Sequence, residues 1–249
     1  MIRRIVYFLV LTGILNLGFS SNKTKPLATG FAVIELFTSE GCSSCPPADA
    51  LIARIAHENK GRPVYILAYH VDYWNRLGWK DKFSDARYSA RQRQYATWLN
   101  LKNVYTPQIV VNGSKEFIGS EEKTLRSALS NALSQKTDVR LEIGTEKQGT
   151  ALTFNYKTNQ KTDDYHLVVA TIKASGINKI ERGENRGKTL AHVQIVSDFE
   201  AFDLKGKASG KINLPAKEKS KDSQIIAFLQ NAKTGKIIAA ANTKNDERN

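Results

Sequence analysis

The sequence predicts an α/β domain that is followed by an all-β, sandwich-like domain. Two short apolar runs, residues 31–37 and 64–69, are separated by a helical pattern, and this order indicates a parallel βαβ unit. After Lys136 the helical periodicity gives way to alternating apolar and polar residues. About seven strand-like runs follow, among them residues 165–174 and 189–199, and turn residues separate them as in an immunoglobulin-like sandwich. The predicted domains are residues 28–136 and 137–243, with a polar tail at 244–249.

The N-terminal residues have the pattern of a secretory signal peptide. A short basic start, residues 1–4, precedes an apolar run over residues 5–19, and small residues flank Phe19 where a signal peptidase would cut. The run is interrupted by Asn16 and is shorter than the ~20 residues that a membrane-spanning helix needs. We therefore expect a signal peptide at residues 1–21, export to the periplasm or the cell exterior, and no stable membrane insertion after cleavage.

The composition is that of a folded protein with a basic surface. The 249 residues are 41% hydrophobic, which is enough for a packed core, and the formal net charge is +13. Much of the positive charge lies in turn-like, lysine-rich segments such as residues 205–221. No basic helix is interleaved with base-stacking aromatic residues, so the sequence predicts no nucleic-acid partner. It predicts no particular oligomeric state.

The two cysteines of the chain, Cys42 and Cys45, are separated by two residues and lie between a predicted strand and a predicted helix. This arrangement is typical of dithiol–disulfide chemistry. A disulfide that closes a four-residue loop stabilises a fold by only about 2 kcal/mol, against about 4.7 kcal/mol for a loop of 100 residues. Structural zinc needs four ligands, and there is no third cysteine. The pair therefore predicts a redox site without metal or cofactor, and an inert local disulfide is the alternative.

Polar residues follow the second predicted strand of the βαβ unit. These are His70, Asp72 and Trp74. Because the carboxyl ends of parallel strands meet at one edge of a sheet, we expect them near Cys42, where they could bind substrate. The histidines of the C-terminal half, His166 and His192, lie in alternating runs typical of structural or surface positions.

The order of elements up to residue 136 resembles the thioredoxin fold. A helix predicted over residues 84–99 belongs to a helical insertion, residues 71–101, and Asn112-Gly113 then marks a β-hairpin before a last helix. The resemblance implies a cis Thr106–Pro107 bond, with Pro107 against the cysteine pair and Thr106 beside the substrate. It also implies a buried acid near the position of Glu35. Glu35 could transfer a proton to Cys45, or it could face away or be paired elsewhere.

Longer motifs resemble one family of exported thioredoxin-like proteins, the domain-of-unknown-function family 1223 (DUF1223). They are Glu-Leu-Phe-Thr-Ser-Glu-Gly-Cys-Ser-Ser-Cys-Pro-Pro-Ala-Asp (residues 35–49), Ala-Tyr-His-Val-Asp-Tyr-Trp-Asn (68–75) and Gly-Glu-Asn-Arg-Gly-Lys-Thr-Leu (183–190). The resemblance implies a thioredoxin-like domain with a helical insertion. It implies no activity, because the family is functionally uncharacterised.

The sequence therefore favours an exported thiol–disulfide oxidoreductase. We expect Cys42 to be the exposed attacking thiol and Cys45 the buried resolving thiol, with protein or small-molecule thiols and disulfides as partners. Two alternatives stay open. Cys42, Cys45 and His70 could form a Cu(I) site of an envelope metallochaperone, or the domain could be a non-catalytic binding scaffold.

Overall fold

The computed structural model describes residues 30–148, 151–214 and 223–243. The expected signal peptide, residues 1–21, and the polar tail, residues 244–249, lie outside the described residues. None of the helices in the described ranges is long and apolar enough to cross a membrane.

The first half of the described chain alternates helices and strands. In order these are β1 (Ala32–Thr38), α1 (Pro46–Glu58), β2 (Val64–His70), a short 3-10 turn η1 (Asn75–Leu77), α2 (Ala86–Trp98), β3 (Gln108–Val111), β4 (Lys115–Ile118) and α3 (Glu122–Ser134). The predicted hairpin is present, and Asn112 and Gly113 turn the chain with φ of 47° and 65°. Helix α2 starts after Asp85, whose carboxylate accepts a hydrogen bond from the backbone N–H of Arg87.

The second half of the chain is built of strands. They are β5 (Leu141–Gln148), β6 (Ala151–Thr158), β7 (Tyr165–Lys179), β8 (Thr189–Asp203), β9 (Ser209–Leu214), β10 (Ser223–Asn231) and β11 (Ile237–Asn242). Strands β5, β6 and β9 form a three-stranded sheet, and the other strands join the large sheet described next. Burial alternates along strands such as β9, as the sequence pattern predicts, whereas β10 is buried on both faces.

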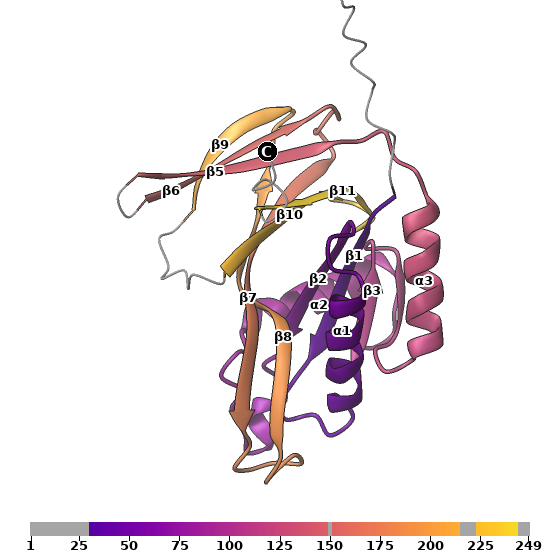
Figure 1. The fold of residues 1–249 in the computed structure, drawn as a ribbon, viewed down its shortest axis with the longest axis vertical. Coiled ribbons are helices and arrows are strands. Elements are labelled where there is room, and N and C mark those ends of the chain that lie inside the picture. Colours follow the sequence, from indigo (N-terminus) through magenta and orange to yellow (C-terminus); the bar gives the residue numbers. More distant parts are fainter. Residues whose placement is uncertain (1–29, 149–150, 215–222, 244–249) are drawn as a thin grey trace, which may run out of the picture.

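One eight-stranded sheet runs through both halves of the chain. Its order is β11-β10-β7-β8-β2-β1-β3-β4, and the two halves join where β2 and β8 pair in parallel at Ala68 and Ile195. The three-stranded sheet packs on the C-terminal strands of the large sheet through a core that includes Phe154, Leu167 and Leu229. The protein is a mixed α/β fold dominated by this sheet (Figure 1). The sheet crosses the predicted domain boundary at residues 136–137, and the division into two domains stays a prediction.

Side chains of β1 alternate between two cores, as the two-residue period of a strand requires. Ile34 and Leu36 pack in the core that contains residues of α1 and α3. Val33 and Phe37 pack in the core that contains residues of α2, β7 and β10. Glu35 shares the second face, so its side chain lies on the side of the sheet opposite α1.

Strands β7 and β8 are longer than the sequence predicts. Each has 15 residues, and the pair extends beyond the predicted strand end at residue 174 to run beside α1 (Figure 1). The extension includes Gly176 and Asn178, which are poor strand formers but pair with His192 and Leu190 of β8. The segment that connects the two strands turns at Gly183 and Gly187, with φ of 76° and 84°. Tertiary pairing therefore extends this hairpin toward the loop after β1.

Candidate functional site

Cys42 and Cys45 form a disulfide in the loop between β1 and α1. Their Cα atoms are 5.4 Å apart, within the range of about 4.4–6.8 Å that is usual for disulfides. The backbone N–H of Cys45 donates to the carbonyl oxygen of Cys42 at 3.2 Å, and helix α1 begins at the next residue, Pro46. The bonded pair thus lies at the start of a helix, as predicted from the spacing of the cysteines.

Both cysteines are buried, and the expectation that Cys42 is exposed is wrong. Each has a relative exposure of 0%, whereas Ser43 and Ser44 between them are exposed. The two serines form the outer surface of the loop, and the sulfur atoms point inward. The spacing of the two cysteines predicted the start of the helix correctly, but it contains no information on which distant residues pack on the loop.

The cover comes from the connection between β7 and β8, which we call the cap (residues 180–188). Asn185 is fully buried, and its side-chain amide donates to the carbonyl oxygens of Cys42 and Glu40, both at 2.9 Å. The carboxylate of Glu184 accepts a hydrogen bond from the backbone N–H of Ser43 at 3.0 Å. Hydrogen bonding to Ser43 lowers the pKa of Glu184. The cap therefore closes the cysteine loop from a segment about 140 residues further along the chain.

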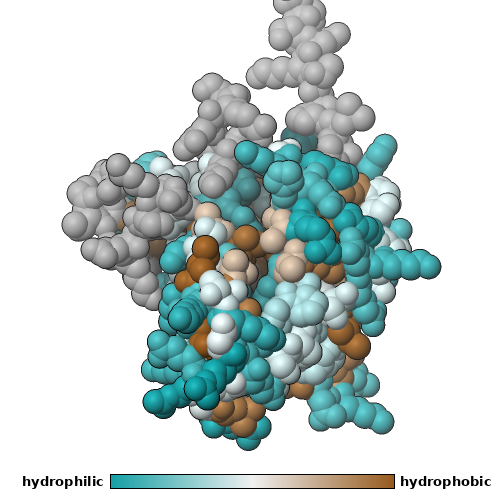
Figure 2. All heavy atoms as spheres, turned by 60° about the horizontal axis from the view of Figure 1, so that its bottom comes forward, coloured by the Kyte–Doolittle hydropathy of each residue, from teal (hydrophilic) through white to brown (hydrophobic). Residues whose placement is uncertain are grey.

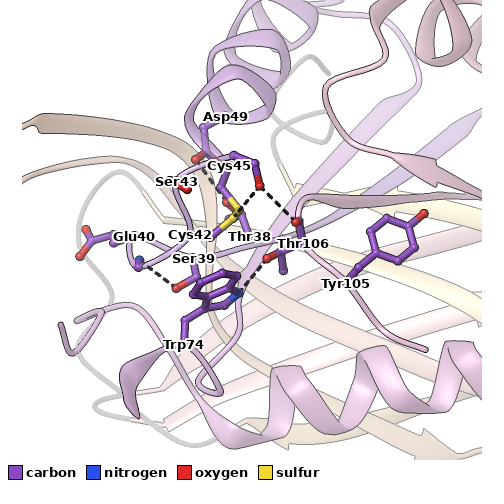
Figure 3. The surroundings of a disulfide bond; sticks show 12 residues. Thr38, Ser39, Glu40, Cys42, Ser43, Cys45, Asp49, Trp74, Tyr105 and Thr106 are labelled. Atoms are coloured by element: carbon purple, nitrogen blue, oxygen red, sulfur yellow. Dashed lines mark hydrogen bonds between the residues drawn. A yellow bond between two sulfur atoms is a disulfide. The ribbon is translucent and has the colours of Figure 1, made fainter. Parts of the chain in front are cut away.

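Trp74 and the segment before β3 form another side of the site (Figure 3). The indole N–H of Trp74 donates to Thr106 Oγ1 at 2.8 Å. A Cβ atom on Gly41 would lie 3.1 Å from the Cβ of Trp74, so the cysteine loop and Trp74 are in close contact. The Thr106–Pro107 bond is cis, as predicted, and Ser44 Oγ donates to the carbonyl oxygen of Thr106 at 3.5 Å. Two predicted site residues, Trp74 and Thr106, thus meet at the cysteine loop, and Pro107 follows Thr106 directly in the chain.

Two predicted site residues have partners elsewhere. Glu35 is buried, and its carboxylate binds Arg91 Nε at 2.7 Å and the hydroxyl of Tyr95. The sequence left open whether Glu35 acts on Cys45, faces away or is paired. In the structure it is paired with Arg91, on the face of the sheet opposite α1. Asp72 accepts a hydrogen bond from Ser89 Oγ of helix α2, and its backbone N–H donates to the same atom at 3.1 Å.

His70 is part of a buried polar cluster. Its Nδ1 lies 2.6 Å from Asp81 Oδ2, and its ring meets the ring of His192 edge to face, with centroids 4.7 Å apart. Asp81 also accepts hydrogen bonds from the backbone N–H groups of Glu40 and Phe83, both at 2.9 Å. Burial by itself raises the pKa of Asp81, but His70 and the two N–H donors outweigh it, so the pKa is lowered overall. Asp81 is therefore a carboxylate at neutral pH.

His192 of β8 lies between two carboxylates in the same cluster. Its Nε2 is 3.5 Å from Glu40 Oε1, and its Nδ1 is 3.7 Å from Asp49 Oδ2. Neither contact has hydrogen-bond geometry, so the attraction is that of ion pairs. Burial by itself lowers the pKa of His192, but Asp49 and Glu40 outweigh this effect and raise the pKa to about 9. His192 is therefore an imidazolium at neutral pH.

The sequence did not identify Glu40, Asp49, Asp81 or His192 as site residues. Glu40 and Asp49 belong to the motif around the cysteines, but nothing local shows that they meet a histidine of β8. In the described part of the chain, no group of three or more His, Cys, Asp or Glu side chains is arranged to hold a metal ion. The cluster instead places buried groups that can donate or accept a proton close to the disulfide.

Fold and site together define a class: a mixed α/β protein with a buried Cys-x-x-Cys disulfide at the start of a helix, next to a cis-proline segment. The chain belongs to the family described as "Protein of unknown function (DUF1223)", which matches residues 33–230. This confirms the family predicted from the motifs.

A solved structure resembles the protein over most of its length. It is the crystal structure of protein AGR_C_4864 from Agrobacterium tumefaciens, with 27% sequence identity and a TM-score of 0.65. The similarity covers 85% of this chain and 92% of the Agrobacterium chain. No curated protein matches the chain.

Proposed function

We propose that this protein is an exported thiol–disulfide oxidoreductase that acts through the Cys42–Cys45 pair. The observation that carries the proposal is the position of the disulfide, directly after the buried strand β1, at the start of α1 and beside the cis Thr106–Pro107 segment. A structural disulfide that closes so short a loop would add only about 2 kcal/mol to the stability. Export rests on the pattern of residues 1–21.

The arrangement of the first half supports a thioredoxin-like assignment. Strands β2, β1, β3 and β4 are adjacent in that order, with β1 parallel to β2 and antiparallel to β3. Helices α1 and α3 share one core and α2 contributes to the other, so helices lie on both faces of these strands. This arrangement supports the thioredoxin-like fold that the resemblance implied.

The exchange would follow the usual two steps of dithiol chemistry. A thiolate attacks the Sγ of Cys42, the Cys42–Cys45 bond breaks, and the electron pair leaves on Cys45 as a thiolate. In the opposite direction the Cys45 thiolate attacks the mixed disulfide on Cys42 and releases the partner's thiolate. Because Cys42 is buried and its backbone carbonyl is bonded to Asn185 of the cap, we expect the cap to move before a partner thiol reaches the sulfur.

Reduction of insulin by dithiothreitol tests the proposal directly. The purified oxidised protein should accelerate the reaction, and Cys42→Ser should abolish the acceleration. Cys45→Ser should trap a mixed disulfide with a thiol partner, visible as a mass increase that dithiothreitol reverses. A Cys42–Cys45 bond that resists excess dithiothreitol in the native protein, together with no acceleration, would reject the proposed function.

Neither alternative use of the cysteine pair has a supporting observation of its own. For Cu(I) binding, His70 would have to serve as the third ligand through its Nε2, because its Nδ1 is bound to Asp81. Within the described residues, however, no three His, Cys, Asp or Glu side chains are arranged to hold a metal ion. Cu(I) titration of the reduced protein, run beside the insulin assay, separates this alternative from redox exchange.

A further inference from the structure

A histidine with no hydrogen bond is buried close to the disulfide. Both ring nitrogens of His192 and the Oε1 atom of Glu40 lack hydrogen-bond partners, although both residues are at most 2% exposed. Buried polar atoms are nearly always bonded, so such atoms need an explanation. Part of the explanation is electrostatic, because the positively charged ring of His192 lies between the carboxylates of Glu40 and Asp49.

Asp49 connects this histidine to the cysteine pair. Cys45 itself has helical geometry, with φ of −79° and ψ of −36°, and its carbonyl oxygen accepts a hydrogen bond from the N–H of Asp49 at 3.1 Å. Residues four apart in helical geometry lie on one face, one turn from each other. Figure 3 shows Asp49 beside Cys45, and Asp49 Oδ2 also accepts a hydrogen bond from Thr38 Oγ1 at 3.2 Å. The carboxylate that faces His192 is thus on the same side of α1 as Cys45.

We infer that His192, acting through Asp49, supplies the proton that Cys45 takes up when the disulfide is opened and removes it when the disulfide is closed. The inference rests on the proposed redox function and names its acid–base group. Such a group is needed because Cys45 is buried and the bulk solvent does not reach its sulfur. Glu35, the acid implied by the resemblance, is held by Arg91 and Tyr95 on the other face of the sheet.

The proton transfer balances in both directions. During reduction a partner thiolate bonds to Cys42 Sγ and Cys45 leaves as a thiolate. One proton then moves from imidazolium to Asp49, and one from Asp49 to Cys45, which leaves neutral imidazole and a Cys45 thiol. During oxidation the proton returns by the same route, and the Cys45 thiolate displaces the partner's thiolate from Cys42. Reduction is completed when a second partner thiolate attacks the partner sulfur of the mixed disulfide, which releases Cys42 as a thiolate and leaves the partner as a disulfide. In the opposite direction a partner disulfide is reduced to thiols, so neither direction needs a further oxidant or reductant.

Each element packed around His192 contributes to its charge state. Glu40 comes from the loop after β1, Asp49 from α1, and His70 from β2 with Asp81 behind it. On β7 the residue opposite is Gly176, over which the ring of Phe83 packs. The other oxygen of Glu40 is fixed by two donors, Trp79 Nε1 at 2.8 Å and Asn178 Nδ2 at 2.9 Å. The negative groups hold the proton on His192, and the cluster can release it when a thiolate forms nearby.

The test is the rate at which dithiothreitol reduces the disulfide of the full chain, divided by the thiolate fraction of the reagent at each pH. In the wild type this corrected rate should fall as the pH rises through about 9, because the imidazolium is lost. His192→Gln should be slower by about 100-fold near neutral pH and show no such fall, since general acid catalysis contributes about 10²–10⁴-fold. His57→Gln, the same change at an exposed position of α1, should match the wild type. A folded His192→Gln variant with the wild-type rate and pH profile overturns the inference.

A second measurement needs no variant. The chain has four histidines, so the ring proton of His192 can be followed by NMR during pH titration. Its apparent pKa should change when the disulfide is reduced, because the proton is then shared with the Cys45 thiol. An apparent pKa that is the same in both redox states overturns the inference even if the variants fail to fold. If instead the wild type exchanges no disulfide at all, the proposed function itself fails, and the two failures are distinguishable.

Discussion

The side-chain amide of Asn185 donates a hydrogen bond of 2.9 Å to the carbonyl oxygen of Cys42, which lies 143 residues earlier in the chain. The same amide group bonds Glu40, and Lys188 Nζ donates to the amide oxygen at 3.0 Å, which fixes its orientation. The cysteine loop and the cap are thus held together by one buried side chain. We therefore expect access to the disulfide to depend on how often this contact opens.

Asn185→Ala should make the disulfide more reactive. The change removes two hydrogen bonds that hold the cap on the loop, each worth about 1 kcal/mol, so the open state should gain about tenfold or more in population. The rate of reduction by dithiothreitol should rise by a similar factor. Arg186→Ala, a change at the exposed neighbouring residue, is the matched control and should leave the rate unchanged. Equal rates in Asn185→Ala and the wild type would mean that the cap does not limit access.

Glu35→Gln should act on stability and not on the exchange of disulfides. It leaves the buried guanidinium of Arg91 without its counter-charge, which typically costs about 3–5 kcal/mol of the free energy of unfolding. Urea unfolding measures this loss. Replacing both partners, Glu35→Leu with Arg91→Met, should restore much of it, because no buried charge is then unpaired.

The matched control for Glu35→Gln is Glu122→Gln, in an exposed ion pair with Arg54, which should lose much less stability. The remaining folded Glu35→Gln protein should reduce insulin at the wild-type rate. A stable Glu35→Gln variant that has lost this activity would instead make Glu35 the acid of the redox site.

The stability of the protein should fall at alkaline pH because of His192. Its pKa is about 9 in the folded state and near 6.5 in the unfolded chain, so the folded state binds the proton more tightly. The resulting stabilisation, on the order of 3 kcal/mol, is fully present below pH 6.5 and is lost as the pH rises through 9. Urea unfolding at several pH values measures it. The difference between the wild type and His192→Gln should shrink over this window, and a constant difference would contradict the raised pKa.

Removing the disulfide should have only a small effect on folding. The loop between Cys42 and Cys45 is short, so the chain-entropy estimate of its contribution is about 2 kcal/mol. The double variant Cys42→Ser with Cys45→Ser should therefore remain folded, with a lower midpoint in urea. The circular dichroism spectrum and the urea midpoint check this. Complete unfolding of the double variant would show that the disulfide is a structural staple.

Short-range patterns in the sequence determined the local elements of the protein. Asn112-Gly113 determined the β3–β4 hairpin because both residues adopt positive φ at low cost, and Asp85 determined the start of α2 because its side chain can cap the helix. The spacing of Cys42 and Cys45 determined a bonded pair at the start of α1. Such signals depend on neighbours within a few residues, so they can be identified without knowing the rest of the fold.

Tertiary structure alone decided which residues surround the disulfide. The pairing of β8 with β2 brings His192 to Glu40 and Asp49, and it places the amide of Asn185 on the backbone carbonyl of Cys42. These contacts join segments more than 140 residues apart, and no periodicity or spacing within either segment encodes them. Each follows from the edge-to-edge pairing of two strands in one sheet, because the register of that pairing decides which polar side chains lie side by side.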